Sequence, residues 1–315
     1  MPEKNSLWKG CTTLVTGGNG FLGRNLVPRI KERCDNVIVP ASREYDLRNH
    51  ESVQKLFRES KPDIVIHAAV HGGGIGHMRQ NPGSIYYDNT MMNTLVTDEA
   101  RKSRVKKFIG IGTICSYPKY TSVPFKEENL WNGYPEETNA PYGLAKKMML
   151  VQTNAYREQY GFNGIHLLLV NMYGPYDDYN PDTSHVIPAL IRKFTEAKRE
   201  GRKTVEAWGT GQASREFLYV KDAVEGIILA TERYDKGDPV NIGAGFEIKI
   251  KDLVDLIAEL TGFDGEIIWD ASKPDGQPRR CLDTSRAEKE FGFKAGTPFR
   301  QGLKKTIEWY EENCL

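Results

Sequence analysis

Short apolar runs alternate with amphipathic stretches through the first half of the chain. The runs TTLVTG, NVIVP, DIVIHAA, KKFIGIGT and IHLLLVN are rich in aliphatic and β-branched residues, as expected of strands covered on both faces of a sheet. Between them, residues 21–34, 50–60 and 142–160 have the periodicity of helices. This alternation predicts an α/β fold built on a doubly wound parallel sheet with at least five strands.

The pattern changes after the fifth run. The stretch NMYGPYDDYNPDTSH concentrates Tyr, Pro, Asp and Asn in a loop of the kind that carries binding groups, and helical segments follow at residues 186–200 and 251–260. We therefore expect two domains. Residues 7–175 and 216–244 would form the sheet domain, and residues 176–215 and 245–315 a smaller C-terminal α/β lobe that binds substrate.

Composition narrows the classes of partner. The chain has 315 residues with 39% hydrophobic content, 43 basic and 42 acidic residues and no long run of one sign, which disfavours nucleic-acid and membrane-surface partners. The start, MPEKNSLWKGC, lacks the apolar stretch of a signal peptide, and no later segment is apolar enough to span a membrane. The five cysteines are widely spaced and odd in number. We expect a cytoplasmic protein without metal-ligand spacing among its histidines and acids.

The stretch VTGGNGFLG follows the first predicted strand and opens the first helix. Its glycines fit the registers Gly17-x-x-Gly20-x-x-Gly23 and Gly18-x-Gly20-x-x-Gly23, which let backbone N–H groups and a helix N-terminus approach a pyrophosphate. A glycine loop at the first strand-to-helix junction of a parallel sheet predicts a Rossmann-type dinucleotide site.

The segment after the second strand bears on the choice of dinucleotide. Where an NAD site has an acidic residue for the ribose 2′-hydroxyl, this chain has Ala41, Ser42 and Arg43, and an arginine suits the 2′-phosphate of NADP. NADP is therefore predicted, with NAD possible. The predicted cofactor-binding residues are Gly17, Gly20, Phe21, Leu22, Gly23, Arg43, Asp46, Leu47, Ala68 and Ala69.

A candidate catalytic set follows from spacing. Tyr142 and Lys146 share one helix face, and Thr113 ends the preceding strand. A lysine near a phenol is expected to lower the tyrosine pKa from its usual value of about 10 and so make Tyr142 a general acid for a carbonyl being reduced. Thr113 is placed to hydrogen-bond the same carbonyl oxygen.

These features resemble the extended short-chain dehydrogenase/reductase family that acts on nucleotide sugars. Within it, CSYPK, NAPYGLAK, NMYGP, SHVIPALIRKF, WGTG, REFLYVKD and SKPDG resemble the GDP-L-fucose synthases over nearly the whole chain. The resemblance implies an NADP-dependent 3,5-epimerase and 4-reductase of a GDP-4-keto-6-deoxy-hexose, working as a homodimer. It also implies that Cys115 and His185 are the epimerising pair, beside the reducing set Thr113, Tyr142 and Lys146. The implied substrate-binding residues are Asn171, Lys193, Trp208 and Arg215.

The chemistry of a 4-ketone explains a cysteine beside a threonine. The ketone acidifies the protons on C3 and C5, and inversion needs one group to remove a proton and another to return one to the opposite face. A thiol and an imidazole, with ordinary pKa values of about 8.5 and about 6.5, both exchange protons near neutrality. Cys115 and His185 are therefore predicted to epimerise and Thr113 to assist reduction, because both reactions centre on one carbonyl.

Several alternatives stay open on the sequence. The enzyme could be an epimerase alone, or a reductase alone on a related sugar such as a GDP-4-keto-heptose, and a non-catalytic dinucleotide sensor is a third reading. Asn19 and Ser42 stand where fucose synthases carry basic residues. The histidines flanking GGGIG, His71 and His77, are expected near substrate or nicotinamide, whereas the remaining ones are expected to be structural or on the surface, namely His50, His67 and His166. A dimer is expected through the helix before RVKKFIGIG and through Ala145, Met149 and Tyr156 on the helix from Tyr142.

Overall fold

The structure is a computed structural model that describes residues 7–273 and 276–315. The first six residues, and Pro274 and Asp275 of the SKPDG motif, lie outside the described residues. Among the described residues, no helix combines the length and the apolar character that crossing a membrane would require.

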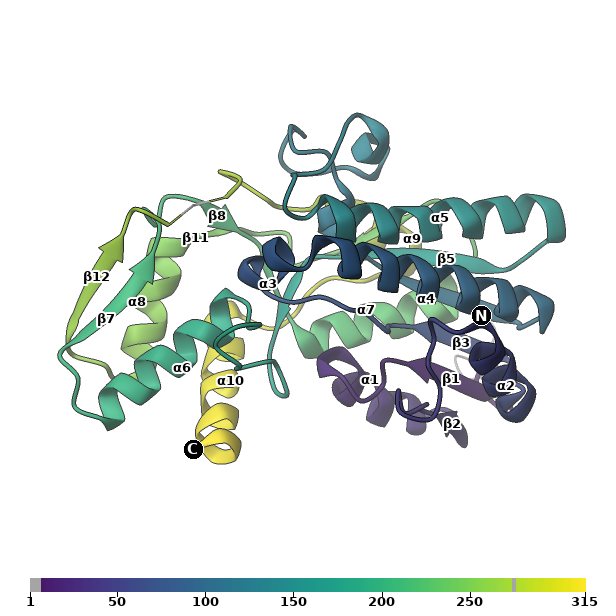
Figure 1. Ribbon diagram of the computed structural model, residues 1–315, viewed down its shortest axis with the longest axis horizontal. Coiled ribbons are helices and arrows are strands. Elements are labelled where there is room, and N and C mark those ends of the chain that lie inside the picture. The colour runs from purple at the N-terminus through teal and green to yellow at the C-terminus, as the bar shows by residue number, and fades with distance from the viewer. Residues whose placement is uncertain (1–6, 274–275) are drawn as a thin grey trace.

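A six-stranded parallel sheet forms the centre of the larger domain (Figure 1). The strand order is β10-β5-β4-β3-β1-β2. The edge strand β2 therefore lies on one side of β1, and β3, β4, β5 and β10 follow one another on the other side. The five predicted strands are all present in it, and β10 extends the sheet beyond β5. The strands are β1 (Thr12–Thr16), β2 (Asn36–Ile38), β3 (Ile64–His67), β4 (Lys107–Thr113), β5 (Gly164–Leu169) and β10 (Val240–Ile242). The predicted doubly wound α/β fold is confirmed.

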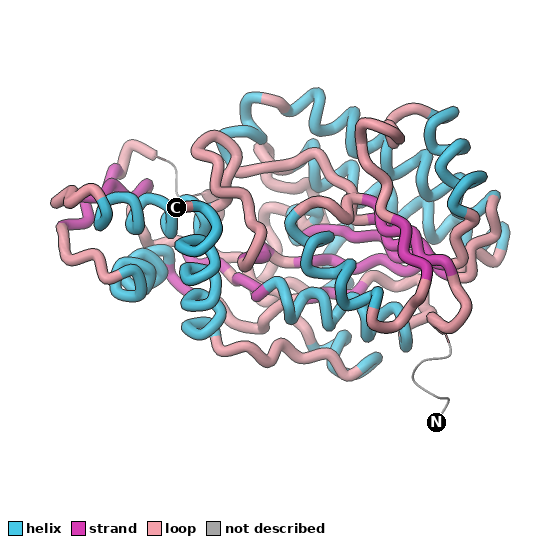
Figure 2. The backbone as a smooth tube through the Cα atoms, turned by 90° about the horizontal axis from the view of Figure 1, so that it is seen from below, coloured by secondary structure: helices cyan, strands magenta, loops and turns pink. Residues whose placement is uncertain are grey.

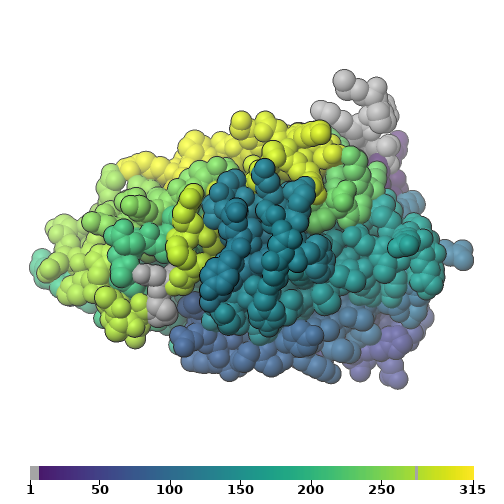
Figure 3. All heavy atoms as spheres, turned by 90° about the horizontal axis from the view of Figure 1, so that it is seen from above, coloured from purple at the N-terminus to yellow at the C-terminus, as the bar shows by residue number. Residues whose placement is uncertain are grey.

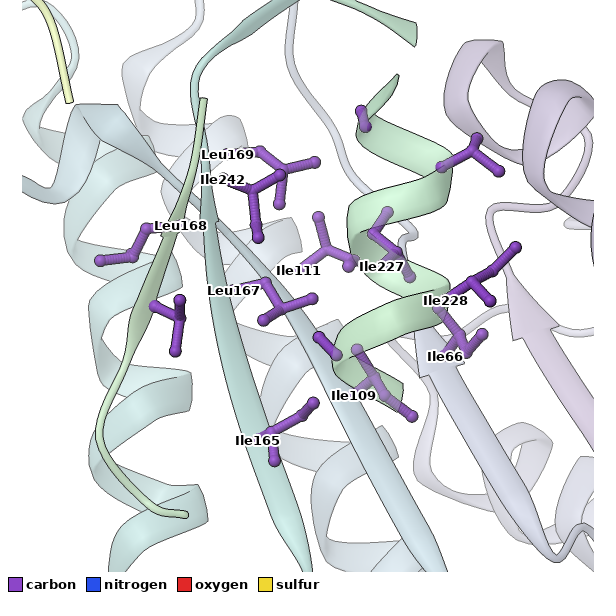
Figure 4. Packing of buried hydrophobic residues seen from close by; sticks show 14 of the residues in the cluster. Ile66, Ile109, Ile111, Ile165, Leu167, Leu168, Leu169, Ile227, Ile228 and Ile242 are labelled. Carbon is purple, nitrogen blue, oxygen red and sulfur yellow. The ribbon is translucent and has the colours of Figure 1, made fainter. Parts of the chain in front are cut away.

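Helices cover both faces of this sheet because its strand side chains alternate between two apolar clusters. Ile109 and Ile111 of β4 point to the face covered by α1 (Phe21–Lys31) and α7 (Val220–Arg233), where Ile227 and Ile228 pack (Figure 4). Phe108 of β4 points to the other face. That face is covered by α2 (His50–Ser60), α4 (Pro82–Lys102) and α5 (Ala140–Tyr160).

A smaller lobe lies to one side of the sheet and has a core of its own (Figure 2). Phe194, Leu253 and Ile307 are fully or almost fully buried in that core. Its helices are α6 (Val186–Arg199), α8 (Ile250–Thr261) and α10 (Phe299–Cys314), and its parallel strand pair is β7 (Thr204–Trp208) with β12 (Glu266–Asp270). The exact division of the chain into two domains stays a prediction.

Short elements connect the two parts. The pairs are β6 (Asn171–Tyr173) parallel to β9 (Phe217–Tyr219), and β8 (Ser214–Arg215) antiparallel to β11 (Ile248–Lys249). The remaining elements are α3 (Ile75–Gln80), α9 (Ser285–Phe291) and the 3-10 turns η1 (Ile114–Ser116) and η2 (Glu127–Trp131). The chain thus crosses between sheet and lobe several times, which brings residues far apart in sequence to the junction.

Two of the three apolar residues expected to form a dimer interface on α5, Ala145 and Met149, are instead core residues, and Tyr156 is half-buried. Ala145 and Met149 are each 1% exposed, and Met149 packs in the cluster under α4 and α2, with Tyr156 against it. Ala145 and Met149 cannot contact a second chain, so the expectation was wrong for these two residues, whereas the dimer itself stays a prediction. A helix with neighbours on one face presents another face to solvent, and on α5 that face carries Met148 and Val151, which are 41% and 44% exposed.

Candidate active site

The glycine loop between β1 and α1 has no room for side chains. Gly17 has a φ of 71°, and a Cβ there would lie 2.7 Å from the backbone of Ala68. A Cβ at Gly23 would lie 2.3 Å from the carbonyl oxygen of Gly17. Gly20 is the N-cap of α1, and its N–H donates to Gly17 O at 3.0 Å. The loop therefore brings the N-terminus of α1 close to the carboxyl ends of β1 and β3, as binding of a pyrophosphate requires.

A cavity of about 340 Å³ opens beside this loop. Five predicted cofactor residues line it: Gly17, Gly20, Asp46, Leu47 and Ala69. The others do not line it: Phe21, Leu22 and Gly23 form the first turn of α1, and Ala68 follows β3. A volume of this size at the carboxyl ends of parallel strands is the usual location of a nucleotide in an open α/β sheet.

Arg43, predicted to bind the 2′-phosphate, is not among the residues that line the cavity. Its side chain is 86% exposed and its Nε lies 3.7 Å from Glu44. Ser42 and Arg48, which were not predicted as ligands, are among the residues that do line the cavity. The guanidinium of Arg48 lies between two aspartates, at 2.9 Å from Asp46 and 3.3 Å from Asp88. No spacing rule distinguishes Arg48 from Arg43, because which side chain turns inward is decided by the loop.

Histidines follow the third strand. His67 is fully buried and is hydrogen-bonded at both ring nitrogens, to Thr16 at 2.7 Å and to Asn93 at 3.0 Å, which confirms its predicted structural role. His71 lines the cavity, and its Nδ1 lies 2.8 Å from a carboxylate oxygen of Asp88. Its other nitrogen lies 3.4 Å from Nε2 of His77. The contacts of His71 and His77 with substrate or nicotinamide stay a prediction.

Thr113, Cys115 and Tyr142 come together where β4 ends. The chain turns through η1 directly after Thr113, and the Thr113 hydroxyl accepts the N–H of Cys115 at 3.2 Å. The first turn of α5 packs closely on η1, because Ser116 donates to the carbonyl of Gly143 at 2.9 Å and a Cβ at Gly143 would lie 2.2 Å from Cys115 O. Tyr142 is hydrogen-bonded to Thr113.

The pKa of Tyr142 differs from the expectation. Burial and the neighbouring Cys115 raise it above the usual value, and the hydrogen bond with Thr113 offsets only part of this effect. Lys146 does not lower it, because Lys146 is itself 1% exposed and burial lowers its own pKa to about 7. Its Nζ donates to the carbonyl of Ala69 at 3.3 Å. Tyr142 is thus held protonated, which is the form that a proton donor needs.

His185 is the N-cap of α6, at the end of the Tyr- and Asp-rich loop. That loop contacts the segment after β3, since the Gly74 N–H donates to Thr183 O at 2.6 Å. Desolvation by surrounding protein lowers the pKa of His185, and the charge of Asp178 offsets part of the effect. The side chain nevertheless retains exposed surface.

The thiol of Cys115 has a neighbour, Arg280, that the sequence does not predict. Nη2 of Arg280 lies 3.4 Å from Cys115 Sγ, and the side chain of Arg280 is buried. On another side, Asn139 Oδ1 lies 3.7 Å from the sulfur. No local sequence pattern could have predicted the first contact, because 165 positions separate the two residues.

The predicted substrate residues occupy the lobe and its junction with the sheet. Nζ of Lys193 lies 5.2 Å from the centre of the Trp208 ring, which is 54% exposed, and Nζ of Lys273 lies 5.4 Å from it. Arg215 lies on β8, and Asn171 on β6, which pairs with β9 just after Arg215. The structure therefore brings Lys193 and Trp208 together, with two cations near one exposed aromatic ring. Binding of substrate by these four residues stays a prediction.

Comparisons with known proteins agree with this geometry. Residues 13–243 match the model of the NAD dependent epimerase/dehydratase family. A probable GDP-L-fucose synthase 1 of Oryza sativa subsp. japonica is 38% identical over 98% of this chain and 94% of its own length. A crystal structure of a GDP-6-OMe-4-keto-L-xylo-heptose reductase from C. jejuni has a TM-score of 0.90 at 29% identity, covering 96% of this chain and 98% of its own. A GDP-L-fucose synthetase from Naegleria fowleri bound to NADP has a TM-score of 0.87 at 27% identity, covering 97% of this chain and 95% of its own.

Proposed function

The chain belongs to the NAD dependent epimerase/dehydratase family, and we propose that it is a 3,5-epimerase and NADPH-dependent 4-reductase of a GDP-4-keto-6-deoxy-hexose. The relatives named GDP-L-fucose synthase support this function along nearly the whole chain. The observation that carries it is the cluster at the end of β4. A thiol, Cys115, lies beside the hydroxyls of Thr113 and Tyr142, so proton exchange and carbonyl reduction have their groups at one point.

The residues around the glycine loop fit a dinucleotide. Gly17 and Gly23 allow the close turn that a pyrophosphate-binding loop needs, and the cavity beside the loop has Asp46 and Leu47 for the adenosine half. When bound, NADPH supplies the hydride for C4. Lys146, which is buried one turn after Tyr142 on α5, would bind a ribose hydroxyl of the cofactor, and exclusion of water from this region would strengthen each polar contact.

In the reduction, Tyr142 donates its proton to the oxygen that forms at C4, and Thr113 donates a hydrogen bond to the same oxygen. The raised pKa of Tyr142 keeps the donor protonated until charge develops on the substrate. In the epimerisation, Cys115 and His185 exchange protons at C3 and C5 while the ketone stabilises the enolate. The lowered pKa of His185 keeps the imidazole mostly neutral at neutral pH, and a neutral imidazole can accept a proton at one nitrogen and donate from the other.

A second candidate is a reductase that acts on a GDP-4-keto-heptose without epimerising it. The TM-score of 0.90 with the heptose reductase favours this alternative. The two functions separate in one experiment: the enzyme is incubated with GDP-4-keto-6-deoxy-mannose or a GDP-4-keto-heptose and NADPH, and the product configuration at C3, C4 and C5 is read by NMR. A product inverted at C3 and C5 supports the bifunctional enzyme, whereas unchanged C3 and C5 in every product contradicts it.

NADPH is expected to be used in preference to NADH. One charge-assisted contact with the 2′-phosphate contributes about 1.5–3 kcal/mol, or about one to two decades in affinity. Arg43 can swing toward the phosphate from its exposed position, whereas Arg48 is already held by Asp46 and Asp88. Arg43→Ala should therefore reduce kcat/KM for NADPH by that factor and leave NADH unaffected, with Arg48→Ala as the matched comparison. Equal efficiency of the wild type with both cofactors would refute the preference.

We also propose a homodimer through the exposed faces of α4 and α5. Met148 and Val151 on α5 and Tyr87 on α4 are apolar or aromatic and more than a third exposed, and these two helices pack side by side (Figure 1). Val151→Glu should convert the dimer to a monomer, because a buried unpaired carboxylate in the interface costs several kcal/mol. Ile268→Glu, at a similarly exposed apolar residue on β12, is the control and should stay dimeric. Light scattering at micromolar concentration measures both, and a monomeric wild type would contradict the proposal.

A further inference from the structure

Arg280 reaches the active-site thiol from the last third of the chain. It lies on an extended segment whose backbone is fixed on two sides. The Glu216 N–H donates to Arg280 O at 3.1 Å, and the Phe125 N–H donates to Cys281 O at 2.7 Å. Figure 3 shows this yellow segment alongside the teal residues of the loop after β4. Hydrogen bonds to Glu216, which lies between β8 and β9, and to Phe125 of the loop thus fix the backbone that carries the guanidinium.

The sulfur of Cys115 lies between a hydrogen-bond donor and a hydrogen-bond acceptor. Nη2 of Arg280 is 3.4 Å from Sγ and can only donate, whereas Asn139 Oδ1 is 3.7 Å from Sγ and can only accept. The orientation of the Asn139 amide is fixed, because its Nδ2 donates to Glu136 Oε2 at 2.5 Å. A thiol can therefore donate to Asn139, and a thiolate can accept from Arg280. Both protonation states of Cys115 have a partner in place.

Arg280 carries its positive charge inside the protein. Its side chain is 9% exposed, and its Nε has no hydrogen-bond partner among the described residues. A buried guanidinium is costly unless an anion accompanies it. A thiolate at Cys115 would supply that anion and form a charge-assisted hydrogen bond. The other titratable group recorded next to the sulfur is Tyr142 from α5, which is neutral, and the carboxylate of Glu136 lies behind Asn139.

We propose that Arg280 is a positioning residue that favours the thiolate of Cys115 and thereby makes Cys115 the base that removes the substrate proton. The catalytic part of this proposal rests on the proposed epimerase function. In that step the C–H bond at C3 or C5 breaks, its electron pair enters the enolate, and the proton forms S–H on Cys115. The thiol then donates its proton in a hydrogen bond to Asn139 Oδ1.

Alkylation of Cys115 tests the proposal without any sugar substrate. Wild type, Arg280→Met, Arg280→Lys and Arg279→Met are treated with iodoacetamide over a series of pH values, and the modified Cys115 peptide is quantified by mass spectrometry. Because the thiolate is the reactive form, Arg280→Met should slow alkylation about tenfold on the acidic side and move the half-maximal rate to higher pH. Arg280→Lys should restore much of the rate. Arg279→Met loses the same charge from a side chain that pairs with Glu247 and should behave as wild type. The exposed Cys314 is the internal reference in each sample.

An unchanged pH dependence of Cys115 alkylation in Arg280→Met would overturn the proposal, and so would an equal loss in Arg279→Met. If Arg280→Met does not fold, Arg280→Lys, which keeps the positive charge, is compared with Arg280→Gln, which removes it. A separate measurement of deuterium exchange from D2O into GDP-4-keto-6-deoxy-mannose tests the epimerase function independently of the role of Arg280. Absent exchange in the wild type refutes the epimerase function, while the alkylation result still decides the role of Arg280.

Discussion

Cys115→Ser is expected to lose nearly all deuterium uptake from D2O at C3 and C5 of GDP-4-keto-6-deoxy-mannose. A serine hydroxyl occupies the same place but is far less acidic than a thiol, so it cannot accept a proton from carbon near neutral pH. Acid–base catalysis by a positioned group typically contributes about 10²–10⁴-fold, and the loss should be of that size. The measurement is NMR of the sugar positions, first without and then with NADPH.

Two comparisons make this experiment specific. Thr113, Tyr142 and Lys146 are untouched in Cys115→Ser, so the variant should still reduce the ketone that has not been epimerised and give a different sugar. His185→Asn should exchange more slowly than wild type or stop after one carbon, because water can share the return of a proton to the opposite face. Wild-type exchange rates in Cys115→Ser would mean that the cysteine only packs against α5, and the epimerisation mechanism would be abandoned.

Tyr142→Phe should retain cofactor binding and lose about 10²–10⁴-fold in the rate of hydride transfer. The ring still fits between η1 and α5, but the proton donor for the oxygen at C4 is gone. Removing the hydroxyl also removes the hydrogen bond with Thr113, whose own hydroxyl keeps the N–H of Cys115 as a partner. NADPH oxidation, followed by absorbance in single-turnover experiments, measures the loss.

Deuterium exchange is the internal control for this second variant. Exchange at C3 and C5 needs Cys115 and His185 but no hydride, so Tyr142→Phe should keep a substantial part of it. A variant that loses exchange and reduction together would indicate a damaged site. NADPH oxidation at the wild-type rate would remove Tyr142 from the mechanism.

Most of the sheet domain could be predicted from the pattern of apolar runs. A strand buried on both faces must be apolar at nearly every position, as in IHLLL of β5. A helix on such a sheet needs one apolar face, as in residues 50–60. These requirements are local, so the sequence displays them. The strand β10, VNI, was not predicted because three residues between turns carry too little pattern. It is a strand only because β5 offers it an edge.

The dimer expectation shows where an apolar pattern is ambiguous. The spacing of Ala145, Met149 and Tyr156 predicts a buried helix face but cannot say whether the same chain or a second chain buries it. In the structure, the cluster beneath α5 and α4 buries that face, and Met148 and Val151 face solvent. The sequence indicated that this helix face is buried, and only the packing of α4 on α5 showed that the same chain buries it.

At the site, the sequence by itself determined the relative positions of residues that lie on one turn, one strand end or one helix face. Gly17, Gly20 and Gly23 act within one strand-to-helix turn, and Thr113, Cys115, Tyr142 and Lys146 stand at a strand end and on one helix face, so their spacing already states their geometry. Only the tertiary structure decided which arginine lines the cofactor cavity, why the pKa of Tyr142 is raised, and that Arg280 lies on the thiol of Cys115. Those features depend on burial and on contacts between segments far apart in the chain, and neither burial nor a distant contact is encoded in the spacing of neighbouring residues.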